Sequence, residues 1–142
     1  MTRSEQQLLV VLLRCVGTVT CLAIVAVFMP RSWMAAIHEW LGMGRFPDAA
    51  IVEYLARSLS AFYVILGGLL WLSSTDVRRY ATLLTYLGVV TIAFAVVIFV
   101  VDLRAGMPWF WAAFEGPVVL CLGAAILLLQ AAAKRPRRGE QQ

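Results

Sequence analysis

The sequence predicts an all-α fold, a transmembrane four-helix bundle with a short interfacial helix between spans one and two. Of its 142 residues, 62% are hydrophobic and only 14% are charged, against about half and about a quarter in soluble domains. Four long apolar segments carry this excess, and the basic residues gather at the ends of those segments, as is typical of membrane proteins. The length suits one domain, which we expect to cover residues 1–133.

Four segments are long enough to cross a bilayer, at about residues 8–29, 48–72, 80–101 and 108–133. Pro30 ends the first segment, because proline cannot continue the hydrogen-bond ladder of a helix. Pro47 and Asp48 favour the start of the second span. Residues 134–142, KRPRRGEQQ, predict a basic polar tail.

The connection between the first two spans is too patterned for an ordinary loop. Trp33, Ile37 and Trp40 recur at helical spacing, which predicts an amphipathic helix over about residues 33–41. Tryptophan favours the depth of the lipid headgroups, so we expect this helix to lie in the membrane interface.

The distribution of Lys and Arg predicts the orientation. The N-terminus, the 73–79 connection and the C-terminal tail share one side in a four-span protein, and they hold eight basic residues against four elsewhere. The positive-inside rule then places both termini in the cytoplasm. The eight are Arg3, Arg14, Arg78, Arg79, Lys134, Arg135, Arg137 and Arg138.

Three charged residues predict a polar site in the outer half. Glu53 and Arg57 lie inside the second span, and Glu115 lies at a similar depth in the fourth. An unpaired charge there costs several kcal/mol, so we expect Arg57 to pair with Glu115, with Glu53 as a second acceptor. The alternative is an Arg57–Glu53 pair within one helix. Asp102, in the neighbouring outer turn, is a further candidate for an ion pair or a ligand site.

Other chemistry finds little support in the residue pattern. His38 is the only histidine, so a structural hydrogen bond is favoured over a metal or haem site. Cys15, Cys21 and Cys121 lie in apolar segments without a CxxC motif, which indicates packing residues. No nucleophile–base pattern, phosphate loop or HExxH motif occurs, which argues against an enzyme. The basic residues are not gathered on one face, so we expect no nucleic-acid partner.

Several short strings resemble the DoxX-like group of small bacterial four-helix membrane proteins. They are LLRCVG in the first span, LG before the second, and GGLLWL followed by a basic turn. Members usually carry a glycine and a lysine after helix one and an acid in the middle of helix two, where this chain reads FMPRSWM and SLSAFYV. The resemblance implies a bacterial inner (plasma) membrane protein, and a membrane subunit associated with quinone or thiol redox chemistry, with quinone or haem as its cofactor.

The residues themselves favour a simpler function. We expect a non-enzymatic integral membrane protein without a cofactor, which packs with partners or binds a small lipophilic molecule in its outer half. Its first partner is the lipid bilayer, and a second copy of the chain or another membrane protein remain open as further partners.

Overall fold

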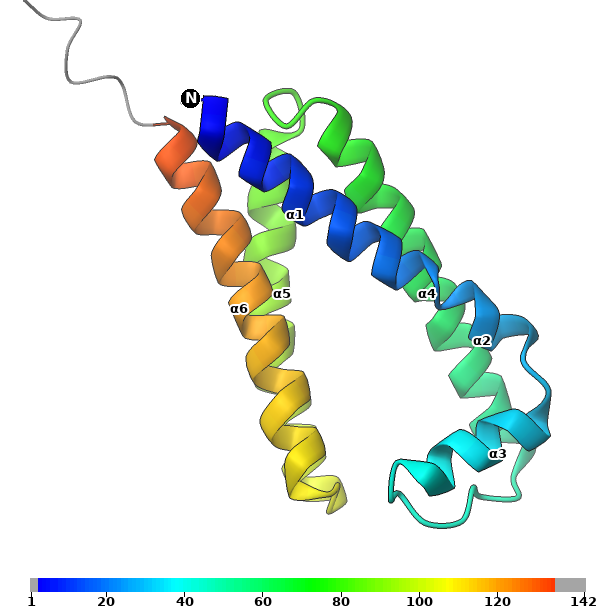
Figure 1. The fold of residues 1–142 in the computed structure, drawn as a ribbon. Coiled ribbons are helices and arrows are strands. Elements are labelled where there is room, and N and C mark those ends of the chain that lie inside the picture. Colours follow the sequence, from blue (N-terminus) through cyan, green and yellow to red (C-terminus); the bar gives the residue numbers. More distant parts are fainter. Residues whose placement is uncertain (1–2, 135–142) are drawn as a thin grey trace, which may run out of the picture. The chain divides into compact units, whose positions relative to one another are not determined.

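A computed structural model describes residues 3–134, and the regular elements within them are all helices, joined by turns (Figure 1). Residues 135–142 of the predicted basic tail lie outside the described residues. The helices are α1 (Arg3–Cys21), α2 (Ile24–Phe28), α3 (Arg31–Trp40), α4 (Ala50–Thr75), α5 (Ala81–Ala105) and α6 (Trp109–Lys134).

Four stretches are long and apolar enough to span a membrane, which confirms the predicted class. They are Ser4–Phe28, Ala50–Thr75, Ala81–Ala105 and Trp109–Ala132. The short helix α3 lies between the first two of them in the chain, as the tryptophan spacing predicts. The chain is therefore a small multi-spanning membrane protein with an additional helix after its first span.

The third span is longer than its hydropathy indicates. It was expected to end near residue 101, but α5 continues through Asp102 to Ala105. Gly106 then adopts the left-handed conformation, with φ at 69°, and its N–H donates to the carbonyl oxygen of Asp102. Glycine tolerates this conformation and ends helices for that reason.

The first span contains a break between α1 and α2 that a continuous apolar run does not reveal. The N–H of Ala23 donates to the carbonyl of Thr20 at 3.1 Å, a bond over three residues, where an α-helix spans four. The Thr20 hydroxyl donates to the carbonyls of Val16 at 2.9 Å and Gly17 at 3.1 Å. Such bonds from a threonine to the preceding turn bend helices, so the break follows from local chemistry and needs no proline.

The described residues form two compact units, one of residues 3–13 with 73–134 and one of residues 14–72. In the first unit α5 and α6 pack closely. A Cβ added at Gly123 would lie 2.9 Å from the carbonyl oxygen of Gly88. The Gln130 amide, 5% exposed, donates to the Ala81 carbonyl at 3.0 Å and accepts from the Thr85 hydroxyl at 2.8 Å. Close packing at small residues and hydrogen bonds between polar side chains commonly join helices in lipid.

In the second unit, the last turns of α1 pack against α4 through small residues. A Cβ added at Gly67 would lie 2.7 Å from the carbonyl oxygen of Gly17. Nearby, the indole N–H of Trp71 donates to the Thr18 hydroxyl at 3.1 Å. The Arg14 guanidinium lies over the same indole, 5.2 Å from the ring centroid.

Candidate functional site

Glu53 and Arg57 lie one turn apart on α4 and form an ion pair. The Glu53 oxygen Oε1 accepts from Nη2 of Arg57 at 2.7 Å and from Nε at 3.1 Å. Both side chains are about two-thirds buried. The spacing of four residues places them on one helix face, which is the geometry that favours such pairs.

The same guanidinium binds the end of the first span. Arg57 donates through Nη1 to the Val27 carbonyl and through Nη2 to the Met29 carbonyl, the latter at 2.9 Å. The last carbonyls of a helix have no donor within the helix, and Pro30 has no N–H to offer. These carbonyls also carry the negative end of the helix dipole. Arg57 is therefore the C-terminal cap of α2.

A second arginine, Arg31, links the start of α3 to the segment just before α4. Arg31 forms an ion pair with Asp48 and donates to the Pro47 carbonyl at 3.3 Å. The Asp48 side chain is 92% exposed, so the pair contributes little free energy. Asp48 was expected to begin the second span, but it binds Arg31 and α4 begins at Ala50.

His38 fixes the turn that follows α3. Its Nδ1 donates to the Gly44 carbonyl at 3.0 Å, and its ring meets Phe46 edge-on, with the centroids 5.4 Å apart. Gly42 and Gly44 take positive φ values of 74° and 82°, a conformation that suits glycine. The histidine thus makes a structural hydrogen bond, and among residues 3–134 no group of three or more His, Cys, Asp or Glu could hold a metal ion.

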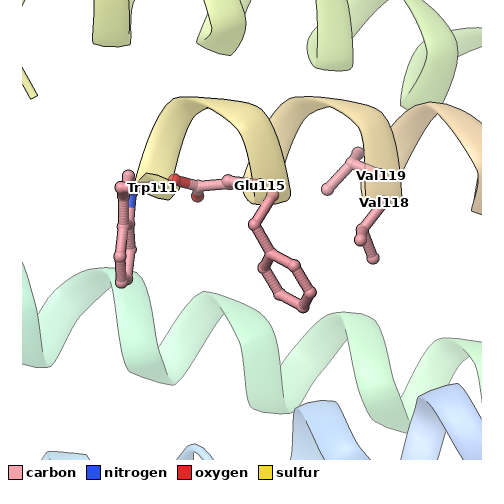
Figure 2. A pocket seen from close by; sticks show the side chains of 5 residues that line it. Trp111, Glu115, Val118 and Val119 are labelled. Carbon is pink, nitrogen blue, oxygen red and sulfur yellow. The ribbon is translucent and has the colours of Figure 1, made fainter. Parts of the chain in front are cut away.

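Glu115 lies in a depression of about 290 Å³ on α6. Figure 2 shows its carboxylate extending along the helix toward Trp111, with Val118 and Val119 on the following turn. Phe114 completes the lining, so Glu115 is the only charged member. Within residues 4–13 and 73–132 the carboxylate has no hydrogen bond and no ion pair.

Asp102 belongs to the same unit and lies in the last turn of α5. It is 5% exposed, and its Oδ2 has no hydrogen-bond partner among the described residues. The contact between Phe99 and Gly116 and the hydrogen bond between Thr85 and Gln130 set the antiparallel register of α5 and α6. This register places Asp102 opposite Ala113, two residues before Glu115. The sequence predicts Asp102 in the turn after the third span, but the residue is buried in the last turn of α5.

The predicted site residues are therefore divided between the two units. Arg57 and Glu53 contact each other and the end of α2, while His38 lies in the turn after α3. Asp102 and Glu115 belong to the α5–α6 pair. The pairing of Arg57 with Glu115 stays a prediction, because the two residues belong to different units.

The sequence does not predict Val27 and Met29 as partners of Arg57. They act through backbone carbonyls, so their residue types carry no signal. Pro30 is the one indication in the sequence, because it predicts carbonyls without helix donors just before it.

Comparison with known proteins identifies no family. No protein-family model matches the chain, and neither a curated protein nor a solved structure matches it. The resemblance to the DoxX-like group is unsupported by these comparisons. The functional assignment therefore depends on the geometry of the chain itself.

Proposed function

We propose that this membrane protein is non-enzymatic and binds a small lipophilic molecule at the depression around Glu115. The observation that carries the proposal is the composition of the lining, four apolar side chains around one carboxylate. Small-molecule sites are mostly apolar, with a few polar groups that fix the orientation of the ligand. The volume of about 290 Å³ lies at the lower end of the range of such sites, roughly 300–1,000 Å³.

We further propose an arrangement in a bacterial plasma membrane with both termini in the cytoplasm, supported by the eight-to-four distribution of basic residues. Residues 1–133 then form one membrane domain. The depression lies in the outer half of this arrangement, because α6 begins after the outward-facing connection at residues 106–108. The α3 helix lies in the outer interface, with the bilayer as its partner, and a second copy or another membrane protein can cover the remaining apolar surface.

Native mass spectrometry after mild solubilisation tests the ligand proposal. Val118→Phe adds bulk to the lining, and Leu128→Phe places the same aromatic ring at an exposed position on α6 outside it. We expect a bound lipophilic molecule on the wild-type chain and on Leu128→Phe, and its loss from Val118→Phe. Equal occupancy of all three proteins would show that the depression is not the site.

The second candidate is a membrane subunit associated with quinone or thiol redox chemistry. It is supported by the presence of Glu115 and Trp111 in the same lining, because a carboxylate can accept a hydrogen bond from a quinol hydroxyl while an indole covers the quinol ring. Purification with a haem or flavin protein, or with quinone bound, supports this alternative. Purification with other lipophilic molecules alone supports the first proposal.

A further inference from the structure

Glu115 of α6 forms no ion pair with a described residue of the α5–α6 pair. Glu115 is the only charged residue between Trp109 and Ala132, and α5 adds Asp102 and Arg104. Arg104 is exposed, and it follows Asp102 by two positions, which places it on a different helix face. An ionised group inside a membrane needs a partner of opposite charge.

Among the described residues of this unit, no basic side chain forms an ion pair with Glu115. The ion pairs Arg31–Asp48 and Arg57–Glu53 both lie in the other unit. Arg57 also has few hydrogen-bond donors left for a further partner. A guanidinium has five N–H donors, and four hydrogen bonds already join Arg57 to Glu53, Val27 and Met29. A partner for Glu115 from outside the chain is therefore favoured.

We propose that the ligand at Glu115 is an amphiphilic organic cation, such as a quaternary ammonium with an aromatic or alkyl body, an inference that rests on the proposed function. The carboxylate would meet the charged group. Trp111 and Phe114 line the same depression, and aromatic faces attract cations. Val118 and Val119 would cover the apolar body of the ligand.

An inorganic cation fits the depression less well. Hard cations such as Mg²⁺ and Ca²⁺ require several oxygen ligands, and the lining supplies one carboxylate among apolar side chains. An organic cation is more weakly hydrated than these ions, so it loses less hydration when it enters the depression. Its apolar body also contacts the apolar lining.

The test compares two probes of similar size, benzyldimethyloctylammonium and the neutral N-benzyloctanamide. Each is titrated into the full chain in a non-ionic detergent, with the change in tryptophan fluorescence as the readout. We expect Glu115→Gln to weaken ammonium binding at least tenfold and to leave amide binding within about twofold. Glu115→Asp retains the charge and should keep most of the ammonium affinity.

The outcomes separate this inference from the function on which it rests. If both probes bind and Glu115→Gln affects neither, the site takes lipophilic molecules without regard to charge, and only the cation assignment is overturned. If neither probe changes the fluorescence of the wild-type chain, and native mass spectrometry finds no bound molecule, both proposals fail.

Discussion

Arg57 shows how one side chain can join two helices of a membrane protein. Its guanidinium holds a carboxylate on its own helix and two carbonyls at the end of another helix. Guanidinium suits this task because its donors point in fixed, divergent directions. Polar groups left without partners in lipid are costly, so the loss of this one side chain affects all its acceptors together.

Replacing Arg57 should destabilise the protein. Arg57→Leu leaves Glu53 unpaired and removes the cap of α2, so we expect a loss of about 1–3 kcal/mol in the free energy of unfolding. Arg57→Lys should recover part of the loss, because an ammonium keeps the charge without the divergent donors. Chemical denaturation in mild detergent measures the effect, and the exposed Arg45→Leu is the control, with an expected change within about 0.5 kcal/mol.

Double variants show which acid depends on Arg57. We expect Glu53→Leu to restore part of the stability lost in Arg57→Leu, because the uncompensated carboxylate is removed as well. Glu115→Leu should do the same if Arg57 also pairs with Glu115. Strictly additive losses for Arg57 and Glu115 would argue that these two side chains never meet.

Two adjacent glycines of α4 should respond oppositely to the same substitution. In Gly67→Ala the new Cβ would lie 2.6 Å from Cys21 Sγ and 2.7 Å from Gly17 O, so we expect a loss of about 1–3 kcal/mol. In Gly68→Ala the Cβ meets nothing within 4 Å, and the higher helix propensity of alanine predicts no loss or a gain of up to about 1 kcal/mol. Equal effects in a denaturation series would show that α1 and α4 are not in close contact here.

The short helix α3 has one side that contacts the protein and another that is exposed. Met34 is buried and His38 is bonded to the turn, whereas Trp33, Ile37 and Trp40 are 63%, 44% and 82% exposed. The exposed three repeat at helical spacing and form one apolar stripe. Because the helix begins only three residues after α2 ends, we expect the stripe to lie near the membrane surface.

Lipids brominated at different depths can test the position of this stripe. We expect the fluorescence component lost in Trp40→Phe to be quenched most strongly by bromine near the headgroups, because the indole ring prefers that depth. Trp33→Phe should give the same depth dependence. A component that no brominated lipid quenches would place the stripe in water or against protein, contrary to the interfacial assignment.

The elements differ in how far the sequence predicts them. The spans are predicted by the length of the apolar segments, and α3 is predicted by the spacing of Trp33, Ile37 and Trp40. Both signals depend only on residue type and position in the sequence, and not on which residues are in contact. The break after Cys21 depends on hydrogen bonds of the Thr20 hydroxyl, which apolar periodicity does not register. The partners of Arg57 lie about thirty positions away and use backbone atoms, so residue type alone could not identify them.

For the whole molecule, the central prediction is the orientation. Arg45→Cys in a background without the native cysteines should react with a membrane-impermeant maleimide added outside intact cells, because the 30–47 connection is expected to face outward. Arg79→Cys should react only after the membrane is permeabilised. The reverse pattern would mean that the charge distribution does not determine the topology of this chain.

The hydrogen bonds from Arg57 to Val27 and Met29 also constrain how the protein is made. Val27 leaves the ribosome thirty residues before Arg57, so the first span reaches the membrane while its last carbonyls lack their guanidinium partner. Only when the second span enters can those carbonyls exchange water for Arg57. Biogenesis of this protein thus has a natural first assembly step, in which the first two spans come together as a hairpin during translation.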